Sequence, residues 1–476
     1  MPSLPRLLTV AALLAGPLAH ATAPPAAPVA ITLQTQAEGQ ALPEEFSGLS
    51  FETQRLLPAA DGSRYFRPDN QPLLQLFHTL GIRCLRIGGN TADRPTVPFP
   101  STEDIDSLFA FARKAGVKVL FTLRLREGDP RQAGAVAKHI VDHHGDLLWA
   151  LAIGNEPSVF SPEYSKFLVM WKQFADVVNA PEFAPAARFA GPSATAGTSG
   201  WTRDFAREFA GTGRLAVATQ HIYPGGNADL VKDPAEGRRL MLSREWVAGY
   251  QKFHDGFVPA VVATGTPVRL GETNSFWNGG RAEASNTFTA ALWALDYMHW
   301  WAAHGLNGVN FHTGDYVAKA ETNTRSMYSA FWSTPHGYEA KPVAYALTAF
   351  TLGGQGRLLP ATVTANPKDL NLTAYAVRAS DGLRLTVINK EYGAQARTAA
   401  VSLVTRPGAV AQIIRLATPD GDIARQTGFT LGGASIQEEG TWAGRWMASA
   451  PADAKGVLVI DVPAASAAII KLPLPE

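Results

Sequence analysis

The stretch LWALAIGNEP, residues 148–157, is a run of apolar residues that ends beside a carboxylate, Glu156. A second stretch, VRLGETNS at residues 268–275, also begins with apolar residues and carries Glu272. Short, largely apolar runs are typical of parallel strands, because both faces of such strands are buried. The two stretches therefore predict two buried parallel strands, each with a glutamate where the strand meets the next loop.

Similar runs recur along residues 46–313 and alternate with segments of helical periodicity. Residues 104–112 have apolar side chains at helical spacing, and Gly116 follows as a helix-ending glycine. Strands that alternate with helices predict βα units, and eight of them predict an α/β fold of the (β/α)8 TIM barrel type over residues 46–350. A doubly wound sheet is the alternative, but it needs a glycine-rich loop after its first strand, and the first run has one glycine. The expected strands are Phe46–Glu52, Cys84–Asn90, Lys118–Arg124, Leu148–Glu156, Arg188–Ala194, Val217–Tyr223, Val268–Asn274 and Gly308–Thr313.

The pattern changes after about residue 350. Residues 370–377 and 383–388 alternate apolar and polar side chains, and turn residues such as those at 380–382 separate the runs. This pattern predicts a C-terminal antiparallel β-sandwich domain over residues 351–476. Residues 29–34 alternate in the same way, so the N-terminal segment 24–45 is expected to add a strand to that domain.

The N-terminus has the pattern of an export signal. Arg6 precedes an apolar stretch that is too short to span a membrane, and small residues follow it. We expect a signal peptide at residues 1–23, cleaved near Ala21–Ala23, and an exported protein in the periplasm or the medium. The rest of the sequence contains no run long and apolar enough for a membrane span.

Composition excludes several kinds of partner and site. The formal net charge is +1, from 42 basic and 41 acidic residues, so no field of one sign favours binding to nucleic acid. Cys84 is the only cysteine, which excludes an intramolecular disulfide and a multi-cysteine zinc site. No cofactor is implied.

The two strand-end glutamates indicate the chemistry. In a barrel the C-terminal ends of the strands meet at one face, where catalytic groups lie. Cleavage of a glycosidic bond needs two carboxyl groups, and their environments must push their pKa values apart. Glu156 is the candidate acid/base and Glu272 the candidate nucleophile, with Asn155 placed to bind the sugar 2-hydroxyl. A retaining mechanism requires the two carboxyl groups to lie about 5–5.5 Å apart.

The fuller motifs resemble glycoside hydrolase family 79, which contains β-glucuronidases and heparanase. They are GLSFET (48–53), RIGGN (86–90), GNEP (154–157), HIY (221–223) and GETNS (271–275), and the resemblance extends over the whole chain after residue 23. The resemblance implies a retaining barrel enzyme with a C-terminal β-domain and a carbohydrate or glycoconjugate substrate. It also implies that Tyr223 donates a hydrogen bond to Glu272, and that Glu52, Asn90 and Tyr316 lie near the sugar.

The sequence departs from that family at one position. Enzymes of the family that bind a glucuronate commonly have a tyrosine five residues after the nucleophile, and here Trp277 stands in its place. Asn278, Gly279 and Gly280 follow, so backbone N–H groups can still approach a sugar carboxylate. The expectation is a β-glucuronidase, with a β-glucosidase or a diglycosidase on the same scaffold as the alternative.

Two other classes of protein are alternatives. His221 and His312 at strand ends could hold a metal beside the glutamates. The zinc motif H-E-x-x-H is absent, however: His139 and His143 are four residues apart, but Ile140 stands where that motif needs a glutamate. No metal site is therefore expected. A non-catalytic carbohydrate-binding protein could use some of the 11 tryptophans and 11 tyrosines. Trp293, however, lies in a helical pattern that favours packing in the core.

Overall fold

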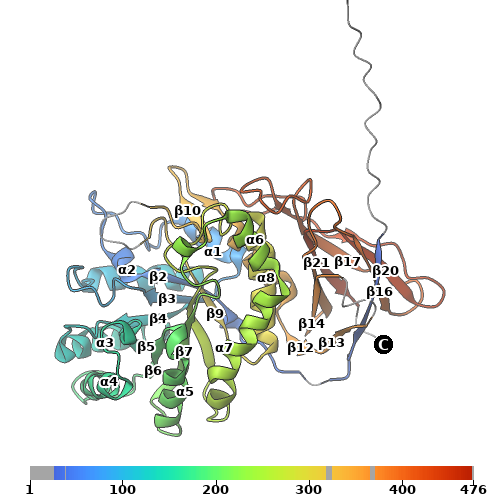
Figure 1. Ribbon diagram of the computed structural model, residues 1–476. Coiled ribbons are helices and arrows are strands. Elements are labelled where there is room, and N and C mark those ends of the chain that lie inside the picture. Colours follow the sequence, from blue (N-terminus) through green and yellow to red (C-terminus); the bar gives the residue numbers. More distant parts are fainter. Residues whose placement is uncertain (1–25, 38, 318–323, 365–369, 474–476) are drawn as a thin grey trace, which may run out of the picture.

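The computed structural model describes residues 26–37, 39–317, 324–364 and 370–473. The expected signal peptide, residues 1–23, lies outside this part. Eight parallel strands close into a barrel in chain order (Figure 1), which confirms the predicted fold class. Each strand coincides with one of the eight predicted runs to within a few residues. The barrel strands are β2 (Ser47–Glu52), β3 (Cys84–Gly88), β4 (Lys118–Leu123), β5 (Leu148–Ile153), β6 (Phe189–Ala194), β7 (Leu215–Ile222), β8 (Val268–Thr273) and β9 (Val309–His312).

Helices surround the barrel, and local sequence explains where they begin and end. α2 starts with a capping box, in which Ser101 and Asp104 each bond the other's backbone N–H. It ends at Gly116, whose φ of 69° is the left-handed conformation expected of a terminating glycine. The helices are α1 (Gln71–Leu80), α2 (Thr102–Ala115), α3 (Pro130–His144), α4 (Tyr164–Val178), α5 (Ser199–Glu208), α6 (Pro234–Leu242), α7 (Arg244–Val262), α8 (Phe288–Ala303) and α9 (Pro342–Gly353). No helix in the described ranges is both long and apolar enough to cross a membrane.

The C-terminal region forms two packed sheets beside the barrel (Figure 1). β1, from the N-terminal segment, joins one of them, where it pairs antiparallel with β13 and parallel with β16. The sandwich is therefore antiparallel except for this one pair. One sheet has the order β13-β1-β16-β20, and the other runs β12-β14-β15-β21-β17-β18 with β19 beside β17. The strands outside the barrel are β1 (Ala27–Leu33), β10 (Phe331–Ser333), β11 (Tyr338–Ala340), β12 (Arg357–Leu359), β13 (Ala361–Val363), β14 (Leu372–Ala379), β15 (Gly382–Asn389), β16 (Ala399–Val404), β17 (Gln412–Ala417), β18 (Thr430–Leu431), β19 (Met447–Ala448), β20 (Val457–Val462) and β21 (Ser466–Leu472).

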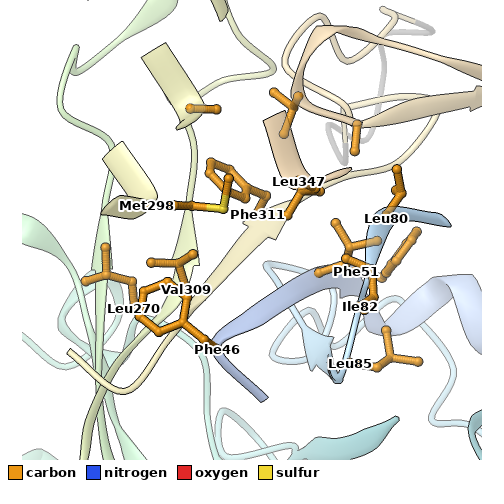
Figure 2. Packing of buried hydrophobic residues seen from close by; sticks show 14 of the residues in the cluster. Phe46, Phe51, Leu80, Ile82, Leu85, Leu270, Met298, Val309, Phe311 and Leu347 are labelled. Carbon is orange, nitrogen blue, oxygen red and sulfur yellow. The ribbon is translucent and has the colours of Figure 1, made fainter. Parts of the chain in front are cut away.

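Helices α8 and α9 connect the barrel to these sheets. They pack against each other, and both also contact the larger sheet. Figure 2 shows Met298 of α8 beside Leu270 and Val309, which belong to the barrel strands β8 and β9. Trp293 of α8 is buried, in agreement with the packing role that its helical pattern predicts. The barrel and the C-terminal sheets therefore share an apolar interface, which fixes the barrel strands on that side.

Candidate active site

The backbone turns sharply where β5 ends. Gly154 has a φ of 82°, and Glu156 has a φ of 47°, which is a left-handed conformation that non-glycine residues rarely adopt. Two hydrogen bonds hold the backbone in this strained conformation. The Asn155 N–H donates to Asp93 at 2.6 Å, and the Glu156 N–H donates to the Ser193 carbonyl at 3.1 Å. Such strained residues persist only where the surrounding structure fixes them, and they cluster at functional sites.

The turn brings Glu156 close to Glu272 at the end of β8. One carboxylate oxygen of each glutamate and one ring nitrogen of His221 all lie within 4.8 Å of one another. Retaining glycosidases hold their two carboxyl groups about 5–5.5 Å apart, whereas inverting enzymes need about 6.5–9.5 Å to admit a water molecule. The spacing therefore fits the retaining geometry.

Glu272 is a buried carboxylate that is compensated from two sides. Arg86 donates to one of its oxygens at 2.7 Å, and the Tyr223 hydroxyl donates to the other at 2.8 Å. Burial alone would raise the pKa of Glu272, but the positive charges of His312, His221 and Arg86, together with the Tyr223 hydrogen bond, hold it well below its ordinary value. Glu272 is thus ionised at neutral pH, as a nucleophile must be.

Arg86 connects the two strand ends that carry the glutamates. Its guanidinium, buried on β3, also donates to Asn155 at 2.6 Å and to Ser50 at 2.7 Å. A planar guanidinium can hold several acceptors in a fixed arrangement, which an ammonium group cannot do. Arg86 therefore sets the position of Asn155 relative to Glu272, and the Asn155 amide keeps its NH2 group as a donor.

His312 and Glu52 form a second charged pair beside Glu272. His312 lies 3.5 Å from Glu52 and 3.6 Å from Glu272. Burial opposes protonation of His312, but the two carboxylates outweigh it and raise its pKa. The Glu52 carboxylate also accepts hydrogen bonds from the backbone of Asn90 and Thr91. Glu52 is thus held in one orientation at the site.

His221 faces the acid/base candidate. Its Nδ1 lies 3.1 Å from Glu156, and its side chain is buried. His221, Glu156 and Glu272 have the donor atoms of a metal site. Arg86, however, already neutralises Glu272 and would repel a cation placed between the two glutamates. The arrangement therefore favours carboxylate chemistry over metal coordination.

A cavity of about 780 Å³ opens above these residues, in the upper part of the usual size range for ligand pockets. Asn155 is buried beside it, and all the other residues singled out from the sequence line it. These lining residues are Glu52, Asn90, Glu156, Tyr223, Glu272, Trp277, Asn278, Gly279 and Tyr316.

Two sequence relatives and one family model match this chain. The model of the glycosyl hydrolase family 79 C-terminal beta domain matches residues 374–469. The beta-glucuronidase of Neurospora crassa is 34% identical over 139 residues, which cover 28% of this chain and 25% of that protein. The beta-glucuronidase of Aspergillus niger is 30% identical over 131 residues, covering 26% and 22%. The similarity in sequence to family 79 is thus shown for the C-terminal β-domain, residues 374–469.

The chain spans only about a quarter of the length of these two sequence relatives, whereas solved structures share its fold over nearly the whole chain. A 4-O-alpha-L-rhamnosyl-beta-D-glucuronidase from Fusarium oxysporum superposes with a TM-score of 0.71 at 20% identity, covering 93% of this chain and all of that chain. A family 51 arabinofuranosidase from Xanthomonas axonopodis reaches 0.64 at 14% identity, covering 93% and 99%. At these identities the similarity establishes the fold.

Residues 277–280, after Glu272, form one wall of the cavity or lie next to it. Trp277 is a half-exposed side chain on the cavity wall, and its backbone pairs with Gly226 and Ala228. The Asn278 amide is already bonded to Asp229. The chain from Asn278 to Gly280 has three successive positive φ angles, of 72°, 86° and 82°. At Gly279 a Cβ atom would lie 2.2 Å from Val317, so only glycine fits there.

Sequence reasoning missed several residues that the fold brings to the cavity. From the sequence, His221 and His312 are considered as metal ligands, and His221 also belongs to the HIY motif, whereas the structure places both imidazoles directly beside the glutamate carboxylates. In the sequence, Arg86 stands out only as part of the RIGGN motif (86–90). Its position inside an apolar strand could have indicated a functional role, because a buried guanidinium needs hydrogen-bond acceptors nearby. Tyr328 lines the cavity, but it comes from a connecting segment without a recognisable pattern.

Proposed function

We propose that this protein is a family 79 enzyme, a retaining β-glucuronidase that hydrolyses a β-linked glucuronide in two displacement steps. The observation that carries the proposal is the pair Glu156 and Glu272, whose carboxylate oxygens approach within 4.8 Å at the ends of β5 and β8. That spacing leaves room for a sugar carbon but not for an additional water molecule.

In the first step Glu272 attacks the anomeric carbon while Glu156 protonates the departing oxygen. Arg86 and Tyr223 keep Glu272 ionised and oriented, since each donates to a different oxygen of the carboxylate. In the second step Glu156 removes a proton from water, which attacks the same carbon and releases Glu272. Asn155, held by Arg86, binds the sugar 2-hydroxyl, a contact that strengthens in the transition state.

The glucuronide specificity rests on two supports. Both sequence relatives are named beta-glucuronidases, and the Fusarium oxysporum structure is a rhamnosyl-glucuronidase. Asn278 and Gly279 line the cavity, and the left-handed segment that they begin continues to Gly280. Backbone N–H groups in such a conformation bind anions such as the sugar carboxylate.

A β-glucosidase or a diglycosidase is the second candidate, and Trp277 is the observation that favours it. Trp277 lines the cavity and is 46% exposed. It stands at the position where enzymes of the family that bind a glucuronate commonly have a tyrosine. Aromatic faces contribute stacking area rather than the hydroxyl donor that a uronate would use. Tyr316, 48% exposed, adds another aromatic surface at the same cavity. The cavity size also suits a substrate of more than one sugar.

The test compares initial rates on 4-nitrophenyl β-glucuronide and 4-nitrophenyl β-glucoside. A preference of at least tenfold for the glucuronide is expected, and proton NMR of the first product should show the β anomer. A glucoside preference would reassign the substrate and leave the mechanism intact. Release of the α anomer would contradict the retaining mechanism.

The glutamate roles can be tested separately from the substrate. Glu156→Ala should retain activity on aryl glycosides with good leaving groups and lose it on alkyl glycosides, because only the latter need general-acid help. Equal loss on both would contradict the assignment of Glu156. We further propose that the protein is exported, on the pattern of residues 1–23; N-terminal sequencing of the protein from the medium or periplasm tests this.

A further inference from the structure

A cluster of histidines lies on the outer surface of the barrel, between α2 and α3, on the side away from the C-terminal sheets (Figure 1). His139 and His144 of α3 both point at Asp106 of α2. Their Nε2 atoms each lie 2.7 Å from the same oxygen, Oδ1 of Asp106. One donor atom from each of the three residues lies within 4.8 Å of the other two. These side chains are outside the cavity and take no part in the mechanism above.

The two imidazoles are held in place by their surroundings. The His144 ring stacks on Phe109, with ring centres 4.7 Å apart and an angle of 2° between the planes. The rings of His139 and His144 are each less than one-fifth exposed, whereas Asp106 is about half exposed. The cluster is therefore ordered on its protein side and open to solvent on its carboxylate side, from which an ion can enter.

A third imidazole, that of His143, lies next to the cluster. Its ring centre is 4.6 Å from that of His139, and its Nδ1 lies 2.9 Å from the His139 carbonyl oxygen. A carbonyl can only accept a hydrogen bond, so Nδ1 carries the proton and Nε2 has the lone pair of the neutral ring. Metal-bound histidines commonly donate their second ring nitrogen to a carbonyl in this way.

We propose that Asp106, His139 and His144 bind one divalent transition-metal ion, zinc in the first instance, with water, or His143 after a rotation of its ring, completing the coordination. Two imidazoles and a carboxylate are ligands that zinc accepts readily, whereas calcium and magnesium require oxygen ligands. On binding, each ring moves its proton from Nε2 to Nδ1, and the lone pair of Nε2 then bonds the metal. The ion would link α2 to α3.

The residues that contact the carboxylate distinguish this cluster from the group of Glu156, His221 and Glu272, which also has metal-binding side chains. Glu272 in the active site has a guanidinium 2.7 Å away, which disfavours a cation there. The hydrogen-bond partners of Asp106 are imidazoles, and a neutral imidazole can exchange its N–H for a metal. The electrostatics therefore favour the surface cluster for a cation.

The test uses the full chain without a histidine tag, treated with a chelator and dialysed. Titration with zinc sulfate in a calorimeter should show one ion bound per chain. The double variant His139→Gln/His144→Gln should bind zinc at least tenfold more weakly. His254→Gln is the matched control, because His254 is also a surface imidazole beside an aspartate, Asp255, at 2.9 Å. That control and Glu156→Gln should bind zinc as the wild type does.

A second readout does not depend on the double variant. Cobalt(II) added to the wild-type chain should give visible absorption bands of a four- or five-coordinate ion with nitrogen ligands, and zinc should remove them. The single variant Asp106→Asn should weaken the cobalt spectrum. Unchanged zinc affinity in the double variant, or no zinc binding by the wild type at millimolar concentration, would overturn the proposal and leave the cluster as a hydrogen-bonded contact between two helices.

Discussion

Two buried carboxylates in this molecule have nearly the same surroundings and different consequences. Glu272 at the mouth of the barrel is bonded by Arg86 and Tyr223. Asp296, on α8 at the interface with the C-terminal sheets, is bonded by Lys390 at 2.8 Å and Tyr375 at 2.8 Å. In both cases burial would raise the pKa of the carboxyl, and the neighbouring cations and hydroxyl donors bring it below the ordinary value.

The difference between the two is what lies on the open side of the carboxylate. Glu272 lines the cavity, with Glu156 within 4.8 Å. Asp296 does not line that cavity. The Thr373 hydroxyl donates a further hydrogen bond to its carboxylate at 2.6 Å. A compensated buried carboxylate is thus a structural ion pair by default. It becomes a nucleophile only where the fold leaves room for a substrate and places a second carboxylate across it.

The largest expected effect comes from removing the proposed nucleophile. Glu272→Ala should lower kcat/KM on an aryl β-glycoside by more than about 10⁴-fold, as loss of a covalent nucleophile does in hydrolases that use one. Sodium azide should restore part of the turnover by occupying the space of the lost carboxylate. Asp296→Asn is the matched control, and its folded fraction should keep wild-type kcat/KM. Full activity in Glu272→Ala would show that the reaction occurs elsewhere.

Removing the cation at the interface should affect stability and not catalysis. Lys390→Met leaves the buried Asp296 without its countercharge, which should lower the free energy of unfolding by about 3–5 kcal/mol. Urea denaturation followed by circular dichroism measures this change. Lys471→Met is the control, because its pair with Asp381 is largely exposed and should contribute much less to stability. Equal losses in the two variants would mean that burial of the Lys390 pair has no particular energetic role.

Removing one hydroxyl donor should have a smaller effect at the active site. Tyr223→Phe should lower kcat/KM by about 10- to 100-fold, since a hydrogen bond to a charged group contributes about 1.5–3 kcal/mol. The pKa of Glu272 should rise without this donor, so the acidic limb of the kcat/KM profile should move to higher pH. Tyr375→Phe, which removes the same donor from Asp296, should leave that limb unchanged. A loss of rate without the pH shift would contradict the electrostatic role of Tyr223.

The last expected effect is gradual, because it is spread over several pH units, and it concerns the interface. Burial, opposed by Asp296, lowers the pKa of His299 to about 3. Between about pH 6.5 and pH 3 the unfolded chain binds a proton at this imidazole that the folded chain does not. The free energy of unfolding should therefore fall with decreasing pH across this window, by at most about 1.4 kcal/mol per pH unit.

The variant His299→Phe tests this contribution. Phenylalanine keeps the aromatic stack on Tyr375, whose ring centre lies 5.0 Å away, but it cannot be protonated. Urea midpoints measured from pH 7 to pH 4 should decline less steeply than those of the wild type. Parallel declines in the two proteins would show that His299 makes no contribution to the acid sensitivity.

Much of the fold could be predicted from the sequence because the relevant signals are local. Each barrel strand is a short, largely apolar run, and helices such as α2 have a periodic apolar face with recognisable caps, here Ser101 and Gly116. Since barrel strands present their C-terminal ends at one face, locating the strands also brought Glu156 and Glu272 to the same place. The exact strand ends were less predictable, because the turn at Gly154 depends on bonds to Asp93 and Ser193.

What the sequence by itself determined is the order of strands and helices and the identity of the two glutamates, because strand burial and strand-end position depend on neighbouring residues. Only the tertiary structure decided which charges surround them. Arg86 and Glu272 are 186 residues apart, and Ser50 and His312 are 262 apart. The ionisation of a buried carboxylate depends on the distances to such partners, and closure of the barrel sets those distances.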